Sequence, residues 1–205
     1  MASTQLEVVR FWWVWLVIQL VVVSWDMSYV LLRPFSMNVW LWQPYSLYAQ
    51  IDYVYGIHPL TKEFNPFCAA QSWMNVVENF FYAVGLYFYR FRGDQNLGYI
   101  IWFGTLVATF SKTVLYAVLE VMDNSINVKH NDWFRFIFMY VIPNNVWTVV
   151  PGFFIFFVFG PAIYAHLNGG KKAAKKVVTK KEAVVVEPKS PRASSRSPRG
   201  RRKQE

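Results

Sequence analysis

Residues 11–32 read FWWVWLVIQLVVVSWDMSYVLL, an almost unbroken apolar run. A transmembrane helix needs about 20 consecutive apolar residues, so this run predicts a first membrane-spanning helix. One acidic residue, Asp26, interrupts the run near its end. An ionisable side chain inside a spanning segment is costly and by default marks a functional site.

Three further runs have a similar length and character, namely residues 68–89, 97–121 and 133–165. The composition agrees, because 55% of the residues are hydrophobic and only 16% are charged, unlike the composition of typical soluble domains. We therefore expect an all-α integral membrane protein whose four transmembrane helices form one bundle within residues 1–168. Pro143 and Pro151 lie inside the last run and predict a bend there.

The Lys and Arg residues outside the helices predict the orientation, because basic short loops face the cytoplasm. Arg10, Arg90 and Arg92 fall on the same side of a four-helix topology as the basic C-terminal segment. Both termini of this multi-pass protein are therefore expected to be cytoplasmic. The connections 33–66 and 122–132 are expected to face the lumen, and the first, rich in Pro, Trp and Tyr, is expected to form a partly structured lumenal cap.

Residues 169–205 hold thirteen of the 21 Lys and Arg residues and predict a disordered basic tail. Two interpretations stay open, namely a solvated tail and adhesion to anionic membrane lipid, tuned by phosphorylation of Ser190 or Ser197. No nucleic acid partner is expected, because the tail lacks interleaved aromatic residues. The ending Arg202-Lys203-Gln204-Glu205 is similar to a dilysine-type retrieval signal and predicts the endoplasmic reticulum membrane.

The chemistry is expected to come from polar groups in or beside the apolar runs. Glu78 lies midway along its run and is the strongest candidate, while Glu120 lies at a helix end where interfacial water could satisfy it. Asn144 and Trp147 are three positions apart and share one face of the last helix. The histidines show no pair with metal-ligand spacing within a helix, so neither a metal nor another cofactor is expected.

These groups suit the migration of a double bond in a polycyclic lipid. That reaction needs an acid to protonate the alkene, a group to stabilise the cation, and a base to remove a neighbouring proton. Two nearby carboxyls cannot readily both ionise, so one of Asp26 and Glu78 would serve as the acid and the other as the base. The indole of Trp147 can stabilise the cation by about 2 kcal/mol when desolvated, and Asn144 can orient a carboxyl or a substrate hydroxyl.

Three runs resemble segments of the emopamil-binding-protein family of sterol isomerases, within the EXPERA superfamily that also includes the sigma-two receptor. They are Tyr48-Ala49-Gln50-Ile51-Asp52-Tyr53-Val54-Tyr55, the run from Val114-Leu115-Tyr116 to Glu120, and Asn144-Asn145-Val146-Trp147-Thr148-Val149-Val150-Pro151-Gly152. The resemblance implies a four-helix core around a deep pocket for sterol-like or amphiphilic amine ligands. It also implies catalytic roles for Asp26 and Glu78 and a place in the sterol site for Asn144 and Trp147. Glu120 and Tyr116 are expected to bind the substrate as well. Asp52 is expected to be structural and to hold the cap to a helix end.

The chain differs from the isomerases at one catalytic helix. They have a His one turn before the first-site acid, where this chain has Val22, and their acid is a Glu, where this chain has the shorter Asp26. These differences are compatible with an altered substrate, an altered mechanism or the absence of catalysis.

Three functions follow from the sequence. The first is a double-bond isomerase for a sterol or related polycyclic isoprenoid, and the second is a membrane protein that binds or traffics such a lipid without converting it. The third is a proton-coupled transporter or channel, which would use the carboxylates as a relay. The oligomeric state stays open, with a homodimer as one candidate.

Overall fold

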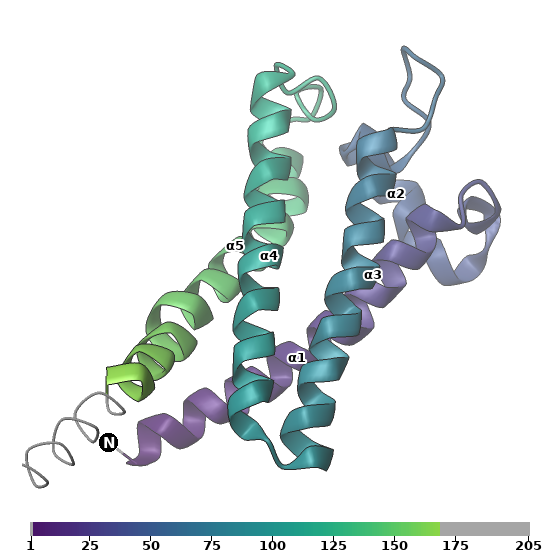
Figure 1. Cartoon of the computed structure of the whole chain (residues 1–205). Coiled ribbons are helices and arrows are strands. Elements are labelled where there is room, and N and C mark those ends of the chain that lie inside the picture. The colour runs from purple at the N-terminus through teal and green to yellow at the C-terminus, as the bar shows by residue number, and fades with distance from the viewer. Residues whose placement is uncertain (1, 169–205) are drawn as a thin grey trace, which may run out of the picture. The chain divides into compact units, whose positions relative to one another are not determined.

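The computed structural model describes residues 2–168, and side chains for residues 10–168. The chain divides into two units, Met1–Tyr164 and Ala165–Glu205, and every helix labelled in Figure 1 belongs to the first. The tail expected at residues 169–205, with its Ser-Pro-Arg sequences and retrieval signal, lies outside the described residues.

The described chain is helical and contains no β-strand between residues 2 and 168. The labelled helices are α1 (Ala2–Leu31), α2 (Pro44–Ile51), α3 (Pro66–Tyr87), α4 (Gln95–Met122) and α5 (Ile142–Phe153). Two π-helical segments, η5 (Arg135–Val141) and η6 (Phe154–Phe159), extend α5 in both directions. The all-α expectation is confirmed for this part of the chain.

Three helical segments are long and apolar enough to cross a membrane, namely Arg10–Leu31, Gln95–Met122 and Arg135–Asn168. These three segments match the first, third and fourth predicted spans and are consistent with a multi-pass membrane protein. Helix α3 has sufficient length but is less apolar, because it carries the polar residues Gln71, Ser72, Asn75, Glu78 and Asn79. The fourth span therefore remains a proposal.

Local signals in the sequence explain where α3 and α4 begin. The Asn65 side chain accepts hydrogen bonds from the backbone N–H groups of Phe67 and Cys68, at 2.9 and 3.1 Å, and Pro66 occupies the first turn. The Asp94 side chain caps α4 by accepting from the Leu97 N–H at 3.0 Å. Gly93 precedes this cap with φ of 70°, which L-residues rarely adopt, and lets the chain reverse direction between α3 and α4.

The helices pack in chain order, with α1 against α3, α3 against α4, and α4 against α5 (Figure 1). Buried aromatic residues hold one half of this arrangement together. Trp12 on α1 lies between Trp102 and Phe154, with ring centroids 5.0 and 4.9 Å away, and Tyr82 is fully buried beside it. The contacts are tilted or edge-to-face, as aromatic pairs prefer.

The connection between α1 and α3 folds back onto the end of α1. The Trp42 indole donates to the Ser28 hydroxyl at 3.1 Å, and the Tyr45 ring stacks on the Tyr29 ring with centroids 4.2 Å apart. This connection is therefore ordered, and it places α2 over the half of the bundle opposite the aromatic core. Whether it faces the lumen depends on the orientation of the spans.

Candidate functional site

A cavity of about 440 Å³ lies among α1, α2, α3, α4 and the segment containing α5. On each of the four long helical segments, the lining residues lie in the half that is close to the connection between α1 and α3. The aromatic core around Trp12 and Trp102 lies in the other half. Its volume is in the range of pockets that enclose small organic ligands. Aromatic side chains line it from every wall except that of α3, namely Trp25, Tyr45, Tyr48, Tyr55, Tyr116 and Trp147.

Asp26 lies in the cavity wall contributed by α1. Its Oδ1 accepts a hydrogen bond from the Tyr45 hydroxyl at 2.7 Å, and Tyr45 comes from α2, which covers this end of the bundle. Among the described residues that line the cavity, Asp26 is the only one with a carboxyl group. Val22, one turn earlier, also lines the cavity, so the position at which the isomerases that the sequence resembles carry a His faces the same space.

Glu78 lies beneath the wall rather than in it. Its side chain is 2% exposed, and the Lys112 Nζ lies 3.0 Å from both of its carboxylate oxygens. Thr109 donates to Oε2 at 2.9 Å, and the Tyr82 hydroxyl in turn lies 3.3 Å from the Thr109 hydroxyl. The structure therefore does not bring Asp26 and Glu78 together as two carboxyls facing one ligand.

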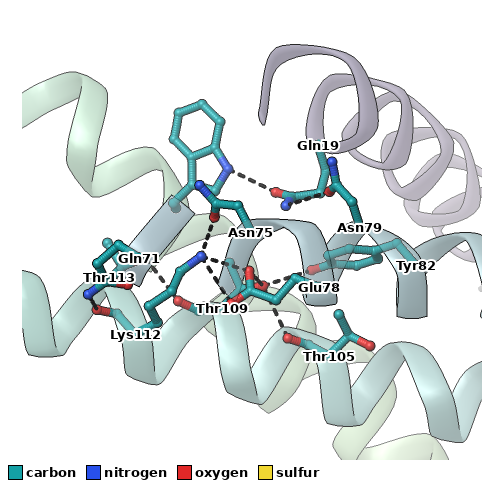
Figure 2. Close-up of polar contacts among 11 residues, drawn as sticks. Gln19, Gln71, Asn75, Glu78, Asn79, Tyr82, Thr105, Thr109, Lys112 and Thr113 are labelled. Carbon is teal, nitrogen blue, oxygen red and sulfur yellow. Dashed lines mark hydrogen bonds and ion pairs between the residues drawn. The ribbon is translucent and has the colours of Figure 1, made fainter. Parts of the chain in front are cut away.

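Lys112 lines the cavity and forms an ion pair with Glu78, which lies behind it. Figure 2 shows its ammonium between Asn75 and Glu78 of α3, and it donates to the Asn75 amide oxygen as well as to Glu78. Lys112 and Asn75 both line the cavity, whereas Glu78 does not. A buried carboxylate costs several kcal/mol unless it is paired and hydrogen-bonded, which explains why Lys112 and Thr109 converge on Glu78.

Trp147 and Asn144 both line the cavity, and polar neighbours fix both. The Trp147 indole N–H donates to the Gln19 Oε1 at 2.8 Å. Gln19 is fully buried, and its amide also donates to the Asn79 Oδ1 at 3.4 Å. The Asn144 amide donates to the Tyr48 hydroxyl at 3.0 Å, which ties the last helical segment to α2.

The remaining expected residues fall near the cap. Tyr116 lines the cavity, but its hydroxyl donates to the Asp52 Oδ2. Asp52 is fully buried, and its Oδ1 also accepts from the Val54 N–H at 3.2 Å, so it joins the connection to α4. Glu120 does not line the cavity, because both of its oxygens accept hydrogen bonds from Asn127, at 3.1 and 2.8 Å. The position of Glu120 therefore gives no support to the expected substrate contact, and the residue instead closes the loop after α4.

The pKa of Asp52 is raised to about 7, mainly because burial disfavours its charged form. The hydrogen bonds from Tyr116 and Val54 act in the opposite direction, and the nearby charge of Glu120 raises the pKa further. Burial also raises the pKa of Tyr45 and of Tyr48 above the usual range, so both hydroxyls stay protonated. The Tyr45 O–H donates to Asp26, and the Tyr48 O–H can donate to a ligand in the cavity.

Sequence reasoning missed two residues that build this site. Lys112 is the only cation inside the run 97–121, and Gln19 is a lone amide in the middle of the run 11–32. The rule that singled out Asp26 and Glu78, namely that a charge in an apolar span marks function, also applies to Lys112. Nothing in the sequence indicates that Lys112 pairs with Glu78, because the contact joins residues 34 positions apart.

A buried acceptor in the cavity wall also lacks a partner. The Gln71 Oε1 is shielded from solvent and accepts no hydrogen bond from the described residues. Buried polar atoms are nearly always hydrogen-bonded, so this atom is available to a donor on a ligand.

Comparisons of the chain with protein-family models, with curated proteins and with solved structures found no match.

Proposed function

We propose that this protein is a membrane-embedded double-bond isomerase for a sterol or a related polycyclic isoprenoid. The observation that carries the proposal is one carboxyl, Asp26, in the wall of an aromatic cavity large enough for such a ligand. A rigid apolar ligand would bury its rings against the aromatic walls, and the polar groups would fix its orientation. Asp26 is then the group that moves the proton.

The route expected from the sequence, through a carbocation, needs a second carboxyl beside Asp26. Glu78 was expected to supply it, but Lys112 lies between Glu78 and the cavity. A single carboxyl is sufficient where it removes a proton from one carbon and returns the same proton to another. We therefore propose Asp26 as the catalytic acid and base, and Glu78 as the partner that fixes and neutralises Lys112.

Trp147 and Asn144 are proposed to bind the substrate. Trp147 offers a large apolar surface whose N–H is already satisfied by Gln19, so the indole can contact rings without leaving a polar atom unpaired. Gln71, with its unpartnered Oε1, and Asn144 provide hydrogen-bonding groups at separate positions of the wall.

The membrane setting is part of the proposal. We propose that α3 is the fourth span, that both termini are cytoplasmic, that the connection at residues 33–66 forms a lumenal cap, and that the protein resides in the endoplasmic reticulum. The support for a span is the pattern of exposure on α3. Its exposed large side chains are apolar, namely Trp73, Met74, Val77, Phe80 and Phe81, as a lipid-facing surface requires.

The experiment uses the purified chain in lipid nanodiscs, a set of sterols with ring double bonds, and deuterated water. Migration of a double bond, seen by chromatography and mass analysis, supports the isomerase when it is lost in Asp26→Asn, and a product without deuterium shows that Asp26 returns the proton that it removed. The matched control is Asp123→Asn, which changes an exposed carboxyl outside the cavity and should leave turnover unchanged.

The second candidate function is lipid binding without conversion, and the ion pair between Glu78 and Lys112 favours it, because it leaves Asp26 as the one carboxyl among the described lining residues. Conversion requires groups that take up and return a proton, whereas binding requires only that the cavity and its polar groups stay in place. Binding of a sterol that returns unlabelled and unshifted from the wild type, across the set, would establish this alternative and overturn the isomerase.

A further inference from the structure

The Lys112 ammonium is the charged group that the proposed isomerisation leaves unused. Its side chain is 14% exposed and lines the cavity. An ammonium has three N–H donors, and the described residues accept two of them in hydrogen bonds, through the Asn75 amide oxygen and the Glu78 Oε2. A ligand atom in the cavity that accepts a hydrogen bond can therefore take the third.

The positive charge of Lys112 favours one of the two routes for moving a double bond, namely the route through an anion over the route through a carbocation. The ion pair is neutral as a whole, but it is oriented, because Lys112 lines the cavity and Glu78 lies behind it. A positive end disfavours a carbocation in the cavity and stabilises an anion. Catalytic sites gain most from fixed donors aimed at the place where charge develops.

The number of carboxyl groups that line the cavity also favours the route through an anion. Protonation of an isolated alkene requires an acid and a separate base, whereas Asp26 is the only carboxyl among the described lining residues. A ketone placed one carbon away from the alkene needs a single base, because the carbonyl holds the electron pair between the two proton transfers.

From the orientation of the Lys112–Glu78 pair toward a cavity with one carboxyl, we propose that the substrate is a β,γ-unsaturated ketone of a polycyclic lipid and that Lys112 stabilises its dienolate. This inference rests on the proposed isomerase function and names its substrate class. It makes Lys112 a catalytic residue that contacts the carbonyl oxygen.

The steps balance without a further reactant. The Asp26 carboxylate removes a proton from the carbon between the carbonyl and the alkene. The electron pair of that C–H bond forms a C=C bond to the carbonyl carbon, and the C=O π pair moves onto the oxygen to give the dienolate. The Lys112 N–H donates a hydrogen bond to that oxygen. The protonated Asp26 then gives the same proton to the far carbon of the former alkene, the carbonyl re-forms, and the product is the conjugated α,β-unsaturated ketone.

The test follows the ultraviolet absorbance of the conjugated enone as the full chain in nanodiscs acts on a steroid 5-en-3-one. Removing Lys112 alone would leave Glu78 buried and unpaired, so the decisive variant is the double change Lys112→Met and Glu78→Gln, which removes both charges. We expect this variant to fold and to lose kcat on the order of a hundredfold, as for the loss of an oxyanion donor. Lys62→Met, at an exposed lysine, is the matched control and should retain full activity.

Spontaneous isomerisation is subtracted with empty nanodiscs and with Asp26→Asn. Ketone turnover that depends on Asp26 but is unchanged in the double variant overturns the role of Lys112. Turnover of a 3-hydroxysterol with a ring-B double bond, without turnover of the ketone, overturns the substrate class and leaves the proposed isomerase intact. Binding of both sterols without conversion of either overturns the isomerase itself.

Discussion

Gln19 fixes the orientation of the Trp147 indole in the cavity wall. It accepts the Trp147 indole N–H at 2.8 Å and donates to Asn79, and it is fully buried. Replacing it with Leu keeps a similar volume but leaves the indole N–H and the Asn79 oxygen without a partner. An unsatisfied buried polar group costs about 1–3 kcal/mol.

We therefore expect Gln19→Leu to lower the free energy of unfolding by about 2 kcal/mol and to weaken ligand binding, because the indole loses its fixed orientation. Thermal unfolding in detergent, followed by tryptophan fluorescence, measures the first effect. Gln50→Leu is the control, because Gln50 is exposed and its side chain donates only to the Ser46 carbonyl among the described residues. Equal destabilisation by the two changes would show that Gln19 has no special part in the wall.

Some residues of the site could be predicted from the sequence and others could not, for a physical reason. A charge such as that of Asp26 in an apolar run is visible from composition alone, and Asn144 and Trp147 share a face because helical periodicity fixes their spacing. All three line the cavity. The pairing of Glu78 with Lys112 could not be predicted, since it depends on the register between α3 and α4.

Helices α3 and α4 pack so closely at one point that only glycine fits. A Cβ at Gly85 would lie 2.4 Å from the Trp102 Nε1 and 2.5 Å from its Cδ1. The Trp102 indole cannot easily move, because it is fully buried and donates to the Tyr82 carbonyl at 3.0 Å. This contact sets the distance between the two helices that carry Glu78 and Lys112.

Gly85→Ala is expected to destabilise the protein by about 1–3 kcal/mol, the usual cost of overpacking a core. The matched control is Gly104→Ala in α4, where an added Cβ meets nothing within 4 Å. There alanine should be neutral or stabilising by up to about 1 kcal/mol, because it favours the helix. Chemical unfolding of both variants measures the difference, and similar values for the two would contradict a tight contact at Gly85.

The connection between α1 and α3 is joined to α4 by a group that titrates near neutral pH. Asp52 is buried and its pKa is raised to about 7 by desolvation. Because the folded state holds this proton more tightly than the unfolded chain, in which the pKa of Asp52 has its ordinary value of 3.8, the contribution to stability is complete below about pH 4. It is lost as the pH rises through about 7.

Between about pH 5 and about pH 8, the wild type should therefore lose up to roughly 3 kcal/mol relative to Asp52→Asn, which cannot titrate. Parallel melting curves of the two proteins at several pH values measure this. Asp123→Asn, at an exposed carboxyl, should follow the wild type. A constant difference between wild type and Asp52→Asn across this range would show that Asp52 does not change its protonation there.

The path of α3, across the membrane or along one side of it, decides the topology of the protein. The mean hydropathy of α3 is lower than that of the other three segments, because this average includes every residue, whether it faces lipid or the inside of the bundle. The structure separates the two faces: Glu78 and Asn79 are buried against α4 and α1, whereas Trp73 and Phe80 are exposed. A polar face satisfied inside the bundle and an apolar face toward lipid are compatible with a span.

The two topologies place three exposed positions differently. If α3 crosses, Leu60 before it and Lys129 after α4 lie on the same side of the membrane, and Asn96 lies on the other. If α3 does not cross, Leu60 shares a side with Asn96 instead. Each of the three is exposed, so each can carry a single cysteine in a Cys68→Ser background, which removes the only native thiol.

Labelling sealed vesicles with a membrane-impermeant maleimide, before and after permeabilisation, reads the side of each cysteine. We expect Leu60→Cys and Lys129→Cys to react together and Asn96→Cys to react from the opposite side. Reaction of Leu60→Cys together with Asn96→Cys would mean that α3 lies within one leaflet or at the surface. The polar network around Glu78 would then lie near interfacial water, and the dry cavity on which the proposed proton transfer depends would not exist.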